Sequence, residues 1–255
     1  MKVGLALGGG AARGLAHIGV LSVLERYRVP IDCVAGTSAG AIVGALFASG
    51  VPLSRIFEEA VKTRWRDLVR LAMHKDGLIK PIGLEKHLTE LMSALEFADL
   101  RTPFAAVATD VTTGQEVVLD SGNVARAVLA SAAVPGIFTP VRIEDRLLVD
   151  GGVVNNVPAS VVRRMGADLV IAVDVNHHEL TRKEPSNIFH IIVNSIHIMQ
   201  RANAQKELAY ADLVIQPDLQ GMGLMDLERC REFVGKGAVA TAAMIPEILR
   251  RLERL

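Results

Sequence analysis

The sequence has few cysteines and no excess of charge of either sign. Its 255 residues include only two cysteines, Cys33 and Cys230, which are too few and too far apart for a disulfide framework. We therefore expect both to be free thiols in a reducing compartment. The 28 Lys and Arg residues balance 28 Asp and Glu residues. Without a block of like charge there is no long-range field to attract a polyanion, which argues against a nucleic-acid partner.

Long apolar runs are also missing. The N-terminus enters a short apolar segment and a glycine run, with neither the apolar core nor the cleavage site of a secretion signal. This predicts a mature cytoplasmic protein. Residues 33–54 carry no charge, and Gly36, Gly40 and Gly44 have the four-residue spacing of packed membrane helices. Because polar residues leave an apolar run of only about a dozen residues, short of the ~20 that a span needs, we expect no transmembrane helix.

What the sequence does contain is an alternation of short apolar runs with longer helical segments. Half of the residues are hydrophobic, which is enough for a large core in a chain of this size. The predicted strands are residues 2–7, 31–35, 104–109, 116–119, 146–149, 169–173 and 213–215. Several are apolar at consecutive positions, as expected of strands covered on both faces. We therefore predict an α/β fold, a single-domain three-layer sandwich over residues 1–255 with a mostly parallel central sheet and helices on both faces.

Helices are predicted between these strands, at residues 15–27, 39–48, 185–207 and 227–255. The last segment is predicted as one or two helices, interrupted near Gly235, Gly237 and Pro246. The segment from Asp110 to Gly114 predicts the turn of a β-hairpin.

Residues 53–100 contain no convincing strand and predict two helices around the turn Lys75-Asp76-Gly77. This helical insertion would serve as a lid or a flank. Within it, residues 53–73 combine an apolar stripe with a basic face and include Trp65, the only tryptophan. Such a helix either lies on a lipid surface or packs against the protein with a solvated charged side, and packing is the commoner outcome.

The strongest local signal is Gly36-Thr37-Ser38-Ala39-Gly40, between a predicted strand and a small-residue helix. This pattern is typical of a nucleophile elbow, a sharp strand-to-helix turn that projects a serine Oγ out of the sheet. Gly36 and Gly40 would avoid clashes with neighbouring backbone, and the helix N-terminus favours developing negative charge. Ser38 is therefore the candidate nucleophile. The alternative is a tight turn with a capping serine.

A second segment, Gly8-Gly9-Gly10-Ala11-Ala12-Arg13-Gly14, also lies between a predicted strand and a helix. Backbone N–H groups of successive small residues can point into one concavity and bind a phosphate or the oxyanion of an acyl-transfer intermediate. Nucleotide motifs do not fit this segment. The dinucleotide fingerprint needs a glycine where Arg13 stands, and a Walker loop needs Lys and then Ser or Thr where Leu15 and Ala16 stand.

A third signal, Asp150-Gly151-Gly152, follows the predicted strand 146–149. Taken alone, an acidic residue before two glycines is typical of a turn. A serine nucleophile, however, needs a base, which is usually a histidine. In the order of the α/β-hydrolases that base would be His177 or His178, but those enzymes place several strands before the elbow and Ser38 follows only the second. The alternative is a dyad in which Asp150 itself contacts Ser38.

Taken together, the glycine-rich loop with Arg13, the elbow around Ser38 and the Asp150 motif resemble the patatin-like phospholipases. The resemblance covers residues 3–158. Four further segments are similar to bacterial members of that family: Leu15-Ala-His-Ile-Gly-Val-Leu21, Ala108-Thr-Asp-Val-Thr-Thr-Gly114, Ser131-Ala-Ala-Val-Pro-Gly-Ile-Phe138 and Val153-Val-Asn-Asn-Val-Pro158.

The resemblance implies a patatin-like α/β fold and an acyl hydrolase with Ser38 as nucleophile and Asp150 as its partner, without a metal or an organic cofactor. It further implies an oxyanion hole made by backbone amides around Gly9, Gly10 and Ala11. Many relatives have glycine at the position of Ala11, where alanine is unfavourable if φ is positive. The supporting motif residues are Gly8, Arg13, Gly14, Gly36, Gly40, Gly151 and Gly152.

The dyad demands an unusual aspartate. A free carboxyl with a pKa near ~3.9 is too weak a base for serine at neutral pH, so Asp150 is expected in a desolvated pocket that raises its pKa. Hydrolysis would proceed by attack of Ser38 on the ester carbonyl, formation of an acyl-enzyme, and release by water activated through Asp150.

Weaker signals have bland explanations. His17 is expected to pack or to form a hydrogen bond, and Arg13 either fixes its loop or meets a lipid phosphate. His190 and His197 lie seven apart on one predicted helix, but two histidines without an acidic ligand are weak support for a metal site. The segment Gly221-Met222-Gly223-Leu224-Met225 either fills the core or lies beside an acyl chain.

The leading hypothesis is a cytoplasmic serine acyl hydrolase that acts on phospholipids or other acyl esters, with peripheral contact to the inner face of the membrane. The runner-up is a catalytically weak or regulatory protein of the same fold that binds an acyl or phosphate-bearing ligand. Ser38, Asp150 and the glycine-rich loop occur together in the chain, which favours the enzyme. The sequence predicts no oligomeric state.

Overall fold

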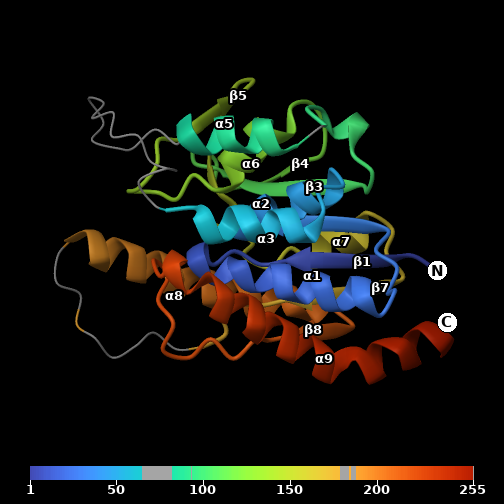
Figure 1. Cartoon of the computed structure of the whole chain (residues 1–255). Coiled ribbons are helices and arrows are strands. Elements are labelled where there is room, and N and C mark those ends of the chain that lie inside the picture. Colours follow the sequence, from blue (N-terminus) through green and yellow to red (C-terminus); the bar gives the residue numbers. More distant parts are fainter. Residues whose placement is uncertain (65–81, 93, 179–183, 185–187, 255) are drawn as a thin grey trace.

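The computed structural model describes residues 1–64, 82–92, 94–178, 184 and 188–254. A central eight-stranded sheet runs through the molecule, with helices on both of its faces (Figure 1). The strand order is β5-β6-β3-β2-β1-β7-β8, and β4 pairs with β3. The strands are β1 (Val3–Leu7), β2 (Cys33–Thr37), β3 (Phe104–Asp110), β4 (Glu116–Leu119), β5 (Val141–Ile143), β6 (Arg146–Asp150), β7 (Leu169–Val173) and β8 (Leu213–Ile215).

The sheet is mostly parallel. Strand β1 at its centre pairs in parallel with β2 and β7, and the parallel arrangement extends to β3 and β8. The pairs β3–β4, β3–β6 and β5–β6 are antiparallel. All the strands predicted from the sequence are present, with ends shifted by at most two residues. Strand β5 was not predicted, because three partly exposed residues make no apolar run.

The two faces of the sheet are covered by different helices. Side chains alternate along the strands, so that Leu5 and Leu7 of β1 join the larger core cluster and Ala6 joins the smaller one. This confirms the predicted three-layer α/β fold. The larger cluster includes residues of α1 (Ala16–Arg26), α2 (Ala39–Ala48), α3 (Leu53–Lys62), α5 (Ile82–Leu91), α6 (Val124–Ser131) and α9 (Cys230–Arg254), and the smaller one includes residues of α7 (Ala159–Arg164) and α8 (Ile188–Glu207).

Helix α9 corrects one prediction. The expected interruption near Gly235, Gly237 and Pro246 is wrong, because α9 runs continuously from Cys230 to Arg254. A Cβ at Gly237 would collide with the backbone carbonyl of Ala16 in α1. The glycine therefore allows two helices to approach closely instead of ending one of them. Pro246 lacks an N–H, so the helix forgoes one hydrogen bond there and continues.

The turn predicted at Lys75-Asp76-Gly77 lies outside the described residues, and so does Trp65. The described part of the predicted interfacial helix packs against the protein. Ile56 of α3 is buried in the larger core cluster, and the Arg231 guanidinium lies 5.4 Å from the Phe57 ring centroid.

Three smaller expectations are also answered. The hairpin between β3 and β4 is confirmed, and Gly114 in its turn has φ of +72°. Cys33 and Cys230 are free and buried. None of the helices within the described ranges is long and apolar enough to cross a membrane.

Candidate active site

Ser38 occupies a strained turn between β2 and α2. Its φ of 54° and ψ of −121° are rarely adopted by a residue with a side chain, and such backbone strain costs on the order of 1–3 kcal/mol. Ser131 links the turn to β3 by two hydrogen bonds. The Ser38 N–H donates to Ser131 Oγ at 2.9 Å, and the Ser131 hydroxyl donates to Val107 O at 2.5 Å. The predicted strand–turn–helix geometry of the elbow is therefore present.

The glycines on either side of Ser38 permit this geometry. A Cβ at Gly36 would lie 2.5 Å from Gly40 O, and a Cβ at Gly40 would collide with Leu7 O of the neighbouring strand. Helix α2 therefore starts in direct contact with the end of β1. That contact brings the elbow next to the glycine-rich loop that follows β1.

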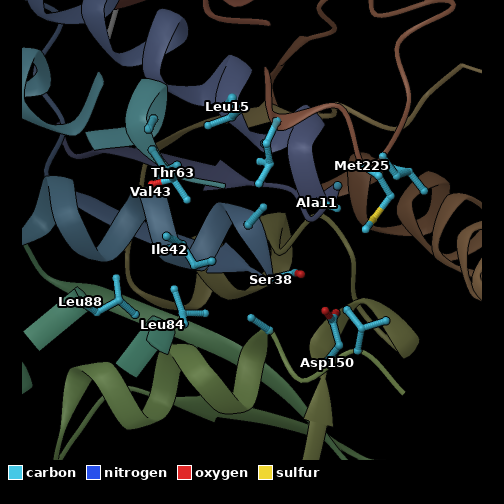
Figure 2. A pocket seen from close by; sticks show the side chains of 18 of the residues that line it. Ala11, Leu15, Ser38, Ile42, Val43, Thr63, Leu84, Leu88, Asp150 and Met225 are labelled. Atoms are coloured by element: carbon cyan, nitrogen blue, oxygen red, sulfur yellow. The ribbon is translucent and has the colours of Figure 1, made fainter. Parts of the chain in front are cut away.

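The register of β3 brings Asp150 to the elbow. Thr37 pairs with Val107, and Asp150 pairs with the next residue, Ala108. Two segments more than one hundred positions apart in the sequence are thus held at adjacent steps of one strand. Figure 2 shows the side chains of Ser38 and Asp150 pointing toward each other from the start of α2 and the end of β6. We refer to these two residues as the reactive pair.

The Asp150 carboxyl is fully buried. Its Oδ1 accepts a hydrogen bond of 2.7 Å from the Gly152 N–H. Oδ2 has no hydrogen-bond partner among the described residues. The Ser38 hydroxyl is nevertheless close enough to favour the ionised form of the Asp150 carboxyl. Burial raises the pKa of Asp150 to about 6, and the interactions with Ser38 and Gly152 offset part of that rise.

The glycine-rich loop leaves two backbone donors open. The N–H groups of Gly8 and Gly9 donate to Val173 O and Asn156 O, each at 3.0 Å. By contrast, the N–H groups of Gly10 and Ala11 have no acceptor among the described residues, and these two residues line the cavity that contains the reactive pair. Gly9 does not line this cavity. We therefore narrow the candidate oxyanion donors from Gly9, Gly10 and Ala11 to the last two.

Ala11 adopts the conformation that the sequence made questionable. Its φ of 47° lies in the left-handed region, which costs a residue with a Cβ roughly 1 kcal/mol or more. The residue opens the 3₁₀ turn η1 (Ala11–Leu15). Figure 2 shows Ala11 near Ser38. The loop therefore carries local strain at the position where its amide faces the cavity.

Two buried side chains hold this loop in place. The Arg13 Nε–H donates to Met222 O at 3.0 Å, and Arg13 Nη1 donates to Asn176 Oδ1 at 3.4 Å. His17 Nε2 lies 2.7 Å from Gly8 O. Because burial lowers the pKa of His17 to about 4, the ring is neutral and its Nε2–H is the donor. The expected hydrogen-bonding role of His17 is confirmed, and the contacts of Arg13 are those of a residue that fixes the loop.

The other glycines of the three motifs lie where chains approach closely. A side chain at any of them would press on a neighbouring group. The groups contacted would be Val173 O for Gly8, the Ala39 Cβ for Gly14, Val107 O for Gly151 and the Gln200 Nε2 for Gly152.

His177 and His178, the alternative candidates for the base, form their hydrogen bonds with residues other than Ser38. His177 Nδ1 lies 3.2 Å from Asp174 O, and His178 Nε2 accepts from the Leu219 N–H at 3.0 Å. Neither histidine lines the cavity of the reactive pair. The structure therefore brings Asp150, and neither of these histidines, to Ser38.

The cavity has a volume of about 490 Å³, within the range of small-molecule sites. Its walls are mostly apolar, from α2, α3 and α5, and in Figure 2 Ile42, Leu84 and Leu88 lie on the side away from Asp150. We call the part around the reactive pair, Gly10 and Ala11 the reaction end. The remainder is the apolar body. Such a cavity suits a long apolar chain attached to a polar group that is held at one end.

His197 and Gln200 line the site, although the sequence suggests His197 only as a weak metal ligand and does not indicate Gln200. Both lie on α8 and line the cavity together with the reactive pair. Both ring nitrogens of His197 lack a partner among the described residues. Their spacing of three places them on one face of the helix, but other polar residues of α8 have the same spacing, so the pattern does not single them out. No cluster of three His, Cys, Asp or Glu residues that suits a metal occurs within the described part of the chain, and the His190 side chain lies outside the described set.

Comparisons with known proteins agree with this architecture. The profile of a family described as patatin-like phospholipase matches residues 5–163. Patatin-like phospholipase domain-containing protein 7 of Mus musculus is 34% identical over 187 residues, which are 70% of this chain and 14% of that protein. Lysophospholipase NTE1 of Scheffersomyces stipitis is 31% identical over 179 residues, 68% of this chain and 12% of that protein.

A solved structure also shares the fold. VipD from Legionella pneumophila superposes with a TM-score of 0.56 at 14% identity, covering 96% of this chain and 66% of VipD. At that identity the likeness concerns the fold alone. The chain is thus similar to a small part of the two large sequence relatives and to about two thirds of VipD.

Proposed function

This chain belongs to the patatin-like phospholipase family, and from that premise we propose that it hydrolyses carboxylic esters of phospholipids or other lipids through Ser38 and Asp150. One observation carries the proposal. A serine on a strained elbow faces a buried carboxylate at the end of an apolar cavity, beside two backbone N–H groups that have no acceptor among the described residues. These are the parts that an acyl-transfer reaction needs.

In the acylation step, Asp150 accepts the proton of Ser38 as Oγ attacks the ester carbonyl. The N–H groups of Gly10 and Ala11 stabilise the negative charge that develops on the carbonyl oxygen, and losing one such donor typically costs ~10² to 10³ in rate. The carbon–oxygen bond of the ester then breaks, and the departing alcohol takes the proton from Asp150. The acyl group stays on Ser38.

In the second step a water molecule replaces the alcohol. Asp150 accepts a proton from this water as it attacks the acyl-enzyme, and Ser38 leaves with that proton. The fatty acid is released and the reactive pair is restored. The pKa of Asp150, raised by burial to about 6, supports this role because a general base acts best when its pKa is near the working pH.

The experiment is covalent labelling with a fluorophosphonate probe. We expect the probe to label the wild-type protein at Ser38, located by mass spectrometry, and to leave Ser38→Ala unlabelled. A phospholipid, a lysophospholipid and a simple ester with the same acyl chain would then be compared as substrates. An unreactive wild type without hydrolysis of any of the three would favour a binding or regulatory protein.

We further propose peripheral contact with a membrane through the outer face of α8. Four large apolar side chains are exposed there, whereas a helix in water normally turns such side chains inward. Residues 188–206 include Arg201 and Lys206 and no acidic residue, which suits a surface with anionic lipids. The exposed residues are Ile191, Ile192, Ile198 and Met199.

The membrane contact is tested by sedimentation with vesicles. Ile198→Asp together with Met199→Asp should reduce binding to vesicles that contain anionic lipid. Val239→Asp, at an exposed apolar residue of α9, is the matched control and should not. Equal binding by both proteins would contradict this part of the proposal.

That residues 1–255 form a single domain also remains a proposal, and limited proteolysis would test it.

A further inference from the structure

Helix α8 turns polar side chains inward at the reaction end of the cavity. His197 and Gln200 are separated by three positions, so they share one face of the helix. Both are buried and both line the cavity. The helix is anchored directly beyond them, where the Asn203 Nδ2–H donates to Val153 O at 2.8 Å. The fold itself therefore holds the two polar side chains beside the reactive pair.

The His197 ring has unused hydrogen-bonding capacity. Only 2% of the residue is exposed, and neither ring nitrogen has a partner among the described residues. Burial, with smaller contributions from Arg13 and Arg201, lowers the pKa of His197 to about 4. Near pH 7 the ring is therefore neutral, with one N–H donor and one acceptor nitrogen. Buried polar groups without partners are rare in folded proteins and require an explanation.

His17 provides the contrast within the same molecule. It is also fully buried and neutral, and its Nδ1 likewise has no partner among the described residues, but its Nε2–H donates to Gly8 O and it does not line the cavity. The His17 ring is thus held by one hydrogen bond within the fold. His197 has none among the described residues and opens onto the cavity, so its partner is expected there.

Gln200 adds a second uncharged polar group at the same place. A Cβ at Gly152 would collide with the Gln200 Nε2 and would lie 2.9 Å from Asp150 Oδ1. The amide and the carboxylate therefore approach a common point. An amide offers both donors and an acceptor, as the neutral imidazole does.

The charges around this point favour an uncharged ligand group. The Asp150 carboxylate would repel an anion, and the guanidinium of Arg13 is already engaged with Met222 O and Asn176 Oδ1. The described residues that line the cavity include no Lys or Arg, so a phosphate would be desolvated there without a facing counter-charge from them. A hydroxyl group is uncharged and can both donate and accept.

We propose that His197 and Gln200 form a polar subsite that binds a free hydroxyl group on the alcohol part of the substrate, next to the ester that Ser38 attacks. The subsite rests on the proposed function and deepens it. It breaks and makes no covalent bond. By holding the alcohol part near Asp150, it positions the departing oxygen where it must collect its proton.

The test compares two esters with the same acyl chain, 1-decanoylglycerol and propyl decanoate, which differ by two hydroxyl groups. For the wild type we expect kcat/KM to favour the glycerol ester by about tenfold or more, because the missing hydroxyl leaves buried polar groups unpaired. His197→Leu should lower this ratio toward 1. His197→Gln, which keeps a donor and an acceptor, should retain most of it.

His177→Leu is the matched control, since His177 does not line the cavity, and the ratio should stay at the wild-type value. Labelling of Ser38 by a fluorophosphonate checks that each variant is folded. If His197→Leu is not labelled, His197→Gln and Gln200→Leu decide, with a retained ratio expected for the first and a lowered ratio for the second.

Two results would overturn the subsite. One is an unchanged ratio in labelled His197→Leu. The other is an equal loss on both esters, which would assign His197 to a bound water or to packing. Failure of the proposed function would give a different result. Ser38→Ala and the wild type would then hydrolyse both esters at the same rate.

Discussion

The two parts of the cavity are built in opposite ways. At the reaction end, Ser38 and Ala11 have a positive φ, and Asp150 and His197 carry buried polar atoms without hydrogen-bond partners among the described residues. In the apolar body, side chains such as Ile56, Leu84 and Leu88 are buried in the main core cluster. The reaction end therefore contains features that lower stability, whereas the apolar body consists mainly of packed apolar side chains that raise it.

This difference teaches where the molecule gives up stability for chemistry. Strain and unpaired polar groups each cost free energy, and the reaction end has both, although Arg28 and Glu144 also have a positive φ elsewhere in the molecule. The apolar body supplies the packing that holds the reaction end in place. Changes that remove a reacting group at the reaction end should therefore affect turnover strongly, with neutral or favourable effects on stability, whereas changes in the apolar body should act mainly on stability.

The sharpest test of this contrast is a pair of substitutions at Ser38. Both Ser38→Ala and Ser38→Gly should reduce kcat/KM by about 10⁴-fold or more, because each removes the nucleophile. Only glycine relieves the positive φ, so Ser38→Gly should have a free energy of unfolding about 1 kcal/mol higher than that of Ser38→Ala. Ester hydrolysis and urea denaturation measure the two effects. Equal stability of the two variants would mean that the elbow carries little strain.

Asp150→Asn should have the next largest effect. We expect kcat/KM to fall by about 10² to 10⁴, since an amide cannot accept the proton of Ser38. In the wild type, kcat/KM should decline as the pH falls through about 6, where Asp150 becomes protonated. A pH–rate profile measures this. A profile without a transition near that pH would contradict the assignment of Asp150 as base.

The same carboxyl links stability to pH. The pKa of Asp150 is about 6 in the folded protein and near ~3.9 in an unfolded chain, so the folded state binds more protons between these values. The contribution of Asp150 to stability is then fully present below pH ~4 and is lost, by roughly 3 kcal/mol, as the pH rises through 6. Asp150→Asn should remove this contribution, which denaturation of both proteins at several pH values would detect. Parallel curves would argue against a raised pKa.

In the apolar body the order of effects should reverse. Leu88→Ala removes a fully buried side chain and should lower the free energy of unfolding by about 2–5 kcal/mol. Turnover of a short-chain ester should change only a few fold, because no reacting atom is touched. Denaturation and kinetics on one preparation measure both. A loss of turnover as large as that of Asp150→Asn would erase the contrast.

The smallest effect is expected for Ala11→Gly. Glycine adopts the φ of 47° without strain, so the variant should be more stable by roughly 1 kcal/mol. The amide at this position remains, and turnover should stay within a few fold of the wild-type value. A stability decrease would mean that the alanine methyl packs more favourably than its backbone is strained.

Local features of this molecule were predictable from sequence, and features set by distant contacts were not. The buried strands appear as apolar runs, and the elbow appears as a glycine–serine pattern between a strand and a helix. The partnership of Ser38 and Asp150 depends on the register of β3, and the motif resemblance anticipated it. No local pattern indicates that the Gly9 N–H donates a hydrogen bond to Asn156 O, or that His197 lines the cavity.

The two errors about helices have different causes, close packing for α9 and short length for α6. Gly237 resembles a helix-breaking residue in sequence, but in space it is the point where α9 touches Ala16 of α1. Helix α6 was not predicted although Asn123, whose side chain accepts from the Arg126 N–H at 2.9 Å, is a recognisable N-cap. An eight-residue helix offers too short a periodic pattern to be recognised.

The register of β3 also bears on how the proposed active site tolerates changes in the chain. Thr37 and Asp150 are aligned by a ladder of main-chain hydrogen bonds, so the distance between the two reactive groups does not depend on the length of the loops that connect them. Surface segments in the intervening chain are therefore free to be lengthened, shortened or exchanged. A single residue inserted within β3 itself, between Val107 and Ala108, would separate Ser38 from Asp150 and should abolish the proposed chemistry although every proposed functional side chain would still be present in the sequence.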